Sequence, residues 1–313
     1  MIKSFKSISG LFGLCIGDAL GVPVEFTSRA ERVKSPVKSM LGYGTWDVPA
    51  GTWSDDSSLT FCLAESLCQG FSLDNIADSF WRWYHEGFWT AHGEVFDIGN
   101  TTFLAIADWK RGIPPLQAGG KSENSNGNGS LMRILPIAYC YEKLTFPELI
   151  SRTQQISCIT HAHLRSQMAC GIYVSIAVYL LSGEIPQVAY EKGLENIEKI
   201  YSAPEYADEM SHFERIFSGK IAELDIDQIQ SSGYVIHTLE ASLWCLLNSL
   251  SYPETVLKAV NLGGDTDTTA AVTGGLAGIY YGMDNIPTEW IEKIARKQDI
   301  MDLAERFAAV VFG

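Results

Sequence analysis

The chain has 313 residues, enough for one large domain or two small ones, and 46% of them are apolar, as in ordinary globular proteins. Its 23 Lys and Arg against 37 Asp and Glu give a net charge of −14, which repels a phosphate backbone, so we expect no nucleic-acid partner. No run approaches the roughly 18 to 20 uninterrupted apolar residues of a membrane span, and we therefore expect a cytoplasmic protein without a membrane segment.

The first predicted helix contains the apolar run 11–16. Lysines precede this run, as in a signal peptide, but Asp18 interrupts it and no convincing cleavage site follows. Apolar residues at four-residue intervals predict helices around 59–67 and 169–177. Further helices are expected at 73–86, 99–110, 131–143, 146–158, 187–200, 233–250, 253–261, 267–281 and 287–297.

Neither period-2 strands nor a dividing linker is evident in the sequence. We therefore predict an all-α fold in which residues 1–313 form one domain. The seven cysteines lie singly in apolar stretches without a C-x-x-C pair, which predicts small buried hydrophobic side chains and neither disulfides nor a zinc site.

Two short acidic clusters stand at predicted helix starts. Ser54, Asp55 and Asp56 precede the first of these helices, where a cap and first-turn acids would stabilise it. Asp265 and Asp267 form a similar pair of acids at another predicted helix start. A helix start needs only one cap, and two close carboxylates repel each other unless cations neutralise them. Oxygen ligands without nearby Cys or His suit Mg²⁺ or Mn²⁺, and four carboxylates favour a pair of ions over a single ion.

The predicted helix that follows the second cluster is poor in bulky side chains. Residues 270–278 read Ala-Ala-Val-Thr-Gly-Gly-Leu-Ala-Gly, although glycine disfavours helices. We expect another helix to pack tightly against this stretch and to hold the acidic cluster rigidly, with a binding groove as the alternative.

Five segments in this order resemble the ADP-ribosylglycohydrolase family, whose best-known branch activates dinitrogenase reductase. They are Gly17-Asp-Ala-Leu-Gly-Val-Pro-Val-Glu25, Gly51-Thr-Trp-Ser-Asp-Asp56, Gly127-Asn-Gly-Ser-Leu-Met-Arg133, Thr160-His161 and Gly263-Gly-Asp-Thr-Asp-Thr268. The resemblance covers nearly the whole chain, and the last segment with its small-residue helix is the most specific.

The resemblance implies a compact orthogonal helical bundle with two Mg²⁺ or Mn²⁺ ions in a central cleft. Carried over residue by residue, the metal ligands are Ser54, Asp55, Asp56, Asp265, Asp267 and Thr268. The family more often has threonine where this chain has Ser54, but serine keeps the ligating oxygen. The implied reaction is hydrolysis of the glycosidic bond that joins ADP-ribose to a side chain of a protein or to a small molecule.

The Gly/Asn/Ser-rich loop before residue 131 is expected to bind the substrate's diphosphate and ribose through closely spaced backbone amides. Its residues are Ser125, Asn126, Gly127, Asn128 and Gly129. Without the resemblance, a flexible linker is the simpler interpretation. The resemblance places His161 on the same side of the cleft, with a helix-capping histidine as the alternative. Arg133 either adds charge there or pairs with a structural carboxylate.

Catalysis of glycosidic hydrolysis requires a positioned water and an acid for the leaving group. We expect the water near Asp55, Asp56 and Asp267, and the acid to be Glu25 or Asp97, which match family positions. The alternatives are a solvated surface acid for Glu25 and a helix cap for Asp97. A carboxylate at Asp97 could also hold a guanidinium, which favours ADP-ribosyl-arginine as the substrate.

Other functions stay open at this point. They are release of O-linked ADP-ribose from serine or a small molecule, an immunity role against an ADP-ribosylating toxin, a non-catalytic protein that binds ADP-ribose, and a two-metal phosphohydrolase. The oligomeric state is not predicted.

Overall fold

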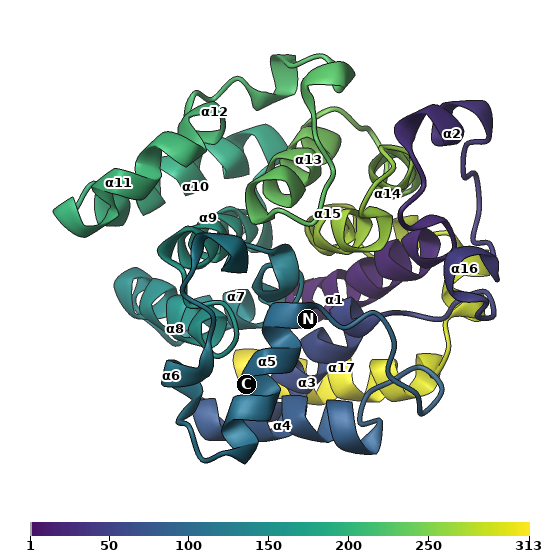
Figure 1. The fold of residues 1–313 in the computed structure, drawn as a ribbon. Coiled ribbons are helices and arrows are strands. Elements are labelled where there is room, and N and C mark those ends of the chain that lie inside the picture. The colour runs from purple at the N-terminus through teal and green to yellow at the C-terminus, as the bar shows by residue number, and fades with distance from the viewer. Residues whose placement is uncertain (1) are drawn as a thin grey trace.

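A computed structural model describes residues 2–313, and side chains at residue 6 and from residue 8 onward. Helix α1 (Ile2–Gly21) crosses the centre of the molecule and packs antiparallel to α15 (Thr266–Tyr281), from the other end of the sequence (Figure 1). A Cβ on Gly13 would clash with the backbone of Gly274, and one on Gly17 with that of Ala270. The expected tight packing of the small-residue helix is confirmed.

The other helices surround this pair. Helices α3 (Asp55–Leu67) and α17 (Lys297–Phe312) pack against α1, whereas α13 (Val235–Leu247) and α14 (Tyr252–Val260) pack against α15. The remaining longer helices are α4 (Leu73–Glu86), α5 (Asn100–Lys110), α8 (Phe146–Cys158), α9 (Leu164–Leu181) and α10 (Pro186–Tyr201). The short ones are α2 (Arg29–Lys34), α6 (Pro115–Ala118), α7 (Leu135–Ala138), α11 (Ala207–Met210), α12 (Glu214–Phe217) and α16 (Thr288–Lys293).

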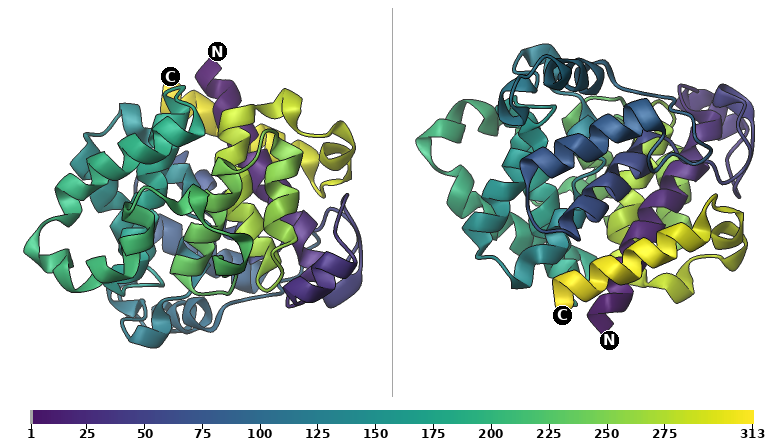
Figure 2. Two further views of the ribbon diagram at one scale, coloured as in Figure 1. Left: turned by 90° about the horizontal axis from the view of Figure 1, so that it is seen from above. Right: turned by 90° about the horizontal axis from the view of Figure 1, so that it is seen from below.

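The all-α prediction is confirmed, because residues 2–313 contain helices, turns and only two isolated β-bridges. The two ends of the chain lie near each other, where α17 crosses α1 (Figure 2). All seven cysteines are free, and four of them, Cys15, Cys62, Cys170 and Cys245, are buried.

Two predicted helices are wrong in extent. The region 131–143 is not one helix but α7 between the 3-10 turns Asn128–Ser130 and Tyr139–Glu142. Pro136 lies in the first turn of α7, where its missing N–H cannot donate to the preceding turn, so the chain starts a new helix there instead of continuing one. The predicted helix 287–297 ends at Lys293, and the chain restarts as α17, which the prediction missed although apolar residues recur at helical spacing in it, at Ile300, Leu303, Phe307 and Val311.

Helix α9 is long and apolar enough, by length and composition, to cross a membrane. In the fold, 78% of that helix is buried, because α8 and α10 pack against it. Its apolar composition therefore reflects a position in the core of this domain.

Candidate active site

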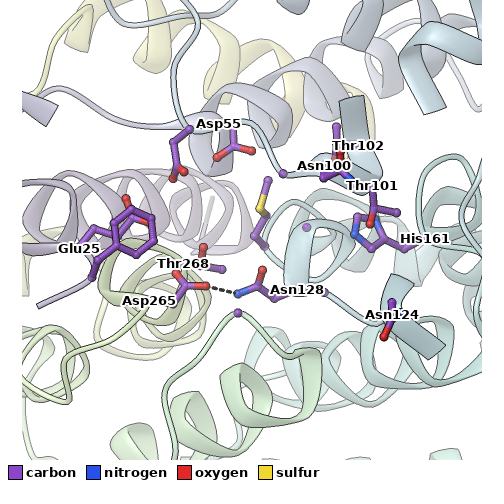
Figure 3. Close-up of a pocket in the computed structure, with 17 residues that line it drawn as sticks. Glu25, Asp55, Asn100, Thr101, Thr102, Asn124, Asn128, His161, Asp265 and Thr268 are labelled. Carbon is purple, nitrogen blue, oxygen red and sulfur yellow. Dashed lines mark hydrogen bonds between the residues drawn. The ribbon is translucent and has the colours of Figure 1, made fainter. Parts of the chain in front are cut away.

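A cavity of about 250 Å³ lies beside the shared end of α1 and α15. At one end it is lined by Glu25, Asp55, Asp265 and Thr268, and at the other by His161, Asn124 and the start of α5, with Asn128 between them (Figure 3). Further lining residues are Phe26, Asp97, Gly99, Gly127, Gly129, Met132 and Gly233. One end of the cavity is thus acidic and the other is rich in hydrogen-bonding groups.

The packing of α1 against α15 brings the two acidic segments together. The last residue of α1, Gly21, has no room for a Cβ because the backbone of Asp267 lies against it. Its carbonyl accepts a hydrogen bond of 2.8 Å from Thr266 Oγ1. Glu25 follows one 3-10 turn later, so the end of α1 and the start of α15 present their carboxylates to one place.

The turn before α3 is held by an aspartate that sequence reasoning did not select. Asp18, within α1, accepts hydrogen bonds of 3.0 Å from the backbone N–H groups of both Ser54 and Ser57, and one from the Ser57 hydroxyl. It is fully buried, and burial raises its pKa to about 6. The available signal was a carboxylate inside an apolar helical run, within the quoted segment Gly17–Glu25.

Two of the predicted ligands, Ser54 and Thr268, contact a third, Asp56. Its Oδ2 accepts hydrogen bonds from Ser54 Oγ at 2.9 Å and from Thr268 Oγ1 at 3.3 Å. Ser54 also caps α3 as the capping interpretation requires, accepting from the Asp56 N–H. At the start of α15 that interpretation fails, because the side chain of Asp265 makes no capping hydrogen bond.

Three buried carboxylate oxygens have no hydrogen-bond partner within the described part of the chain: Asp56 Oδ1, Asp265 Oδ1 and Asp267 Oδ2. Carboxylate oxygens lie within 4.8 Å of one another in two groups, Asp18–Asp56–Asp267 and Glu25–Asp265–Asp267, which share Asp267. Burial, followed by the charges of neighbouring acids, raises the pKa of Asp55, Asp56 and Asp267 well above the ordinary value. Such an uncompensated all-oxygen cluster fits hard divalent cations and could hold metal ions.

Both candidate acids lie at the cavity. Glu25 is 3% exposed, so the surface-acid interpretation is wrong; burial, reinforced by the charge of Asp97, raises its pKa to about 8. Its Oε2 accepts a hydrogen bond of 2.5 Å from Trp46 Nε1. Asp97 has a left-handed backbone, with φ of 54°, and burial raises its pKa to about 6. The cap of α5 is Gly99, so Asp97 is not that cap.

The glycine-rich loop divides into lining and supporting residues. Gly127, Asn128 and Gly129 line the cavity, and Asn128 Nδ2 donates to Asp265 Oδ2 at 2.8 Å, joining the loop to the acidic end (Figure 3). Ser125 and Asn126 are outside the lining; their side chains bond to Ser122 and Ser166 and hold the loop in place.

His161 lines the cavity beside this loop, and the cap of α9 is His163. Burial lowers the pKa of His161 to about 3, so its ring is neutral near pH 7. Arg133 does not reach the cavity lining. It is fully buried beneath the loop, where it donates to the carbonyl of Gly129 and, at 2.8 Å, to Thr160 Oγ1.

The start of α5 is a part of the cavity that sequence reasoning missed. Gly99, Asn100, Thr101 and Thr102 line the wall, and no side chain caps this helix. The Oγ1 of Thr102 is buried without a hydrogen-bond partner in the described chain. Uncapped N–H groups and the positive end of the helix dipole favour an anion. The available signal was Gly-Asn-Thr-Thr at a predicted helix start.

The aromatic residues of 80–89, which precede this region in the sequence, do not line the cavity. Phe80 and Trp83 are buried in the core.

Comparison with known proteins gives a consistent result. A family model described as ADP-ribosylglycohydrolase matches residues 5–312. The chain is 33% identical over 304 residues to ADP-ribosylarginine hydrolase Tri1 of Serratia proteamaculans, covering 96% of this chain and 78% of that protein. It is 35% identical over 306 residues to the Tri1 protein of Pseudomonas putida, covering 96% and 77%.

A solved structure described as an ADP-ribosylglycohydrolase-related protein complex superimposes with a TM-score of 0.83 at 30% identity, covering 99% of each chain. The match therefore extends over the helices that carry the cavity. From the family model over residues 5–312 and these relatives, the chain belongs to the ADP-ribosylglycohydrolase family, enzymes that hydrolyse glycosidic linkages of ADP-ribose.

Proposed function

We propose that this enzyme hydrolyses the bond between ADP-ribose and an arginine side chain and releases ADP-ribose. The observation that carries the proposal is a single cavity with a carboxylate cluster at one end and a wall rich in hydrogen-bonding groups at the other. The two Tri1 relatives are named for ADP-ribosylarginine, which supports this linkage.

We assign the metal ligands as Ser54, Asp55, Asp56, Asp265, Asp267 and Thr268, holding two Mg²⁺ ions, with Mn²⁺ as the alternative. When bound, such ions neutralise the carboxylates and supply Lewis-acid chemistry beside the ribose. The shared position of Asp267 in both carboxylate groups supports two neighbouring ions over one. Both carboxylate oxygens of Asp18 accept hydrogen bonds that hold the turn at Ser54, so we give it a supporting role.

We assign the diphosphate to the wall formed by the start of α5, the loop residues Gly127, Asn128 and Gly129, and His161. The Oγ1 of Thr102, buried and without a partner, supplies a further donor on that wall. Ser125 and Asn126, predicted as direct substrate contacts, act in this scheme through the shape of the loop.

The two cavity acids take different tasks in the proposal. Glu25, with its pKa near 8, keeps its proton at pH 7 and is suited to protonate the leaving group. Asp97, with its pKa near 6, is mostly ionised at pH 7 and is suited to hold the guanidinium. Asp55 and Asp56 orient the attacking water. This assignment favours arginine over serine, whose hydroxyl carries no positive charge.

The test is to incubate the purified protein and Mg²⁺ with two peptides, one ADP-ribosylated on arginine and one on serine. Release of ADP-ribose from the arginine peptide alone is the expected result. Release mainly from the serine peptide would show that the enzyme acts on the serine linkage instead of the arginine linkage. AMP as the product would indicate a phosphohydrolase.

Asp97→Asn and the matched surface variant Asp208→Asn sharpen this test. The Asp97 variant should keep ADP-ribose binding and lose most turnover of the arginine peptide, because it loses the charge that faces the guanidinium. Asp208, exposed on α11, should behave as wild type. Equal turnover by both variants would remove the role given to Asp97.

A further inference from the structure

Arg133 is a buried cation that the proposed reaction does not use. It is 0% exposed, and among the side chains described it forms no ion pair, although the charge of Asp55 acts on it from a longer distance. Its Nε has no hydrogen-bond partner, and its guanidinium carbon lies 4.8 Å from the ring centre of Phe80. Burial without a counter-ion costs free energy, so the role of this arginine must be found among its remaining contacts.

Those contacts lead to the cavity wall. Arg133 donates to the carbonyl of Gly129, and its Nη2 donates at 2.8 Å to Oγ1 of Thr160. The same hydroxyl lies 2.7 Å from Nδ1 of His161. Arg133, Thr160 and His161 therefore form one chain of hydrogen bonds that begins in the core and ends at the cavity.

The direction of this chain follows from donor and acceptor chemistry. A guanidinium only donates, so the Thr160 oxygen accepts from Arg133 and keeps its own proton to give. Nδ1 of His161 is the one acceptor in contact with that hydroxyl in the described structure. If Nδ1 were protonated instead, the Thr160 proton would be buried without a partner, which is unfavourable. Nδ1 is thus the acceptor, and Nε2 carries the hydrogen.

Nε2 of His161 lies over the glycine-rich loop. A Cβ placed on Gly129 would come within 3.3 Å of it, and one placed on Gly127 within 3.6 Å. His161 lines the cavity, and no described residue is a hydrogen-bond partner of Nε2 (Figure 3). The N–H group is therefore available to a ligand in the cavity.

We propose that Arg133 is a positioning residue that, through Thr160, fixes His161 as an N–H donor towards an anionic ligand. Arg133 also engages the Gly129 carbonyl, so it restrains both the ring and the loop on which the ligand lies. This proposal rests on the proposed function in one respect, which is that the anion is the diphosphate of ADP-ribose.

Thr160→Val and Thr160→Ser provide a matched pair for the test. Valine removes the hydroxyl at nearly constant volume, whereas serine keeps it. In ¹⁵N-histidine NMR spectra of the metal-free protein, wild type and the serine variant should show His161 protonated at Nε2, and the valine variant should show a mixture of both neutral forms. Protonation of wild-type His161 at Nδ1 would overturn the proposal.

Ligand binding gives the second measurement. In the valine variant only the fraction of His161 that is protonated at Nε2 can donate, so roughly equal populations of the two neutral forms should weaken ADP binding about twofold, with adenosine binding unchanged. Arg133→Lys keeps the charge but not the two-armed geometry, and should weaken ADP binding in the same direction. Unchanged ADP affinity in the valine variant would refute the inference even if Arg133→Lys does not fold.

These outcomes are separate from those of the proposed function. Both measurements use ADP and the tautomer of His161, and neither needs turnover. Failure to release ADP-ribose from the arginine peptide, with the expected NMR and ADP results, would reject the proposed linkage and keep the role of Arg133. Turnover of the arginine peptide with unchanged ADP binding in Thr160→Val would keep the proposed linkage and reject the role of Arg133.

Discussion

Removal of divalent cations should affect this protein more at pH 7 than at pH 5. The proposed metal ligands at the acidic end hold protons more strongly than free acids do, since burial, followed by the charges of neighbouring acids, raises the pKa of Asp55, Asp56 and Asp267 well above the ordinary value. The metal-free folded protein therefore keeps at least one proton on this cluster at pH 7. Bound cations must displace that proton, so protons compete with the metal for the site.

The competition between protons and Mg²⁺ sets how much the stabilisation by Mg²⁺ changes with pH. Each displaced proton makes Mg²⁺ binding tenfold tighter per pH unit, which is about 100-fold, or roughly 2.7 kcal/mol, between pH 5 and pH 7. For a chain of 313 residues, unfolding entropy of about 2.1 cal/mol/K per residue converts this to roughly 4 °C in Tm. The Tm difference between samples with MgCl₂ and with EDTA should therefore grow by at least about 4 °C.

In the metal-free protein, the stability contributed by these carboxylates changes with pH in the direction opposite to that of most carboxylates. Because the folded pKa values exceed the unfolded ones, the folded state binds more protons, and the stability contributed by these acids is lost as pH rises from about 4 towards 8. His161 has the opposite effect, since its lowered pKa adds stability as pH rises towards about 6.5. Subtracting the EDTA value from the MgCl₂ value at each pH cancels the contribution of His161 and of remote groups.

Differential scanning fluorimetry at pH 5, 6 and 7 gives this difference directly. Glu25→Gln serves as the control, because it leaves the proposed metal ligands in place and its amide oxygen can still accept from Trp46; the Mg²⁺-induced change in Tm of this variant should depend on pH as steeply as that of wild type. A Mg²⁺-induced change in Tm of equal size at pH 5 and pH 7 would show that no proton is displaced, and would refute the reasoning.

Three further substitutions test separate parts of the structure. Asp267→Asn should abolish the Mg²⁺-induced rise in Tm and lower kcat at least about 10³-fold, without lowering the metal-free Tm. The reason is that it removes a buried charge common to both carboxylate groups. Retained Mg²⁺ stabilisation would contradict this prediction. Phe26 is 67% exposed at the cavity, with φ of 64°, and should contact the cationic leaving group. Phe26→Ala should therefore raise KM for the arginine peptide roughly two- to fivefold and leave ADP affinity unchanged. An equal loss of affinity for both ligands would contradict this contact. Gly17→Val should destabilise the fold by about 3 kcal/mol in urea denaturation, since its side chain would meet the backbone of α15; wild-type stability would mean that the α1–α15 contact is looser than described.

Much of the acidic end could be predicted from sequence because its signals are local. Ser54, Asp55, Asp265 and Asp267 stand beside glycines at helix starts, and their repetition exceeds what capping needs. The structure adds the spatial fact that Asp265 does not cap α15 and leaves an oxygen unpaired. The all-helical architecture was equally accessible, because the periodicity of the long helices extends over several turns.

The remaining features depend on contacts between distant segments. Asp18 resembles an interruption in an apolar helix until the turn at Ser54 folds onto it, 36 residues later in the sequence. Arg133 was expected to add charge at the loop or to pair with a carboxylate, whereas in the fold its guanidinium donates to Thr160 at 2.8 Å. Neither partner is indicated by spacing or composition, since each contact exists only after the helices have packed. The break at Pro136 shows a different limit, because the apolar pattern continues through it.

The net charge of −14 initially argues against an anionic ligand, and the arrangement of the cavity resolves this conflict. The carboxylates gather at one end, where divalent cations would neutralise them, while the donors of α5 and His161 occupy the other end. Asn128 connects the two, because both of its N–H bonds are used, one by Asp265 and one by Thr238. Any shift of Asp265 towards a cation therefore acts on the loop that is proposed to bind the diphosphate, so metal binding and anion binding should reinforce each other.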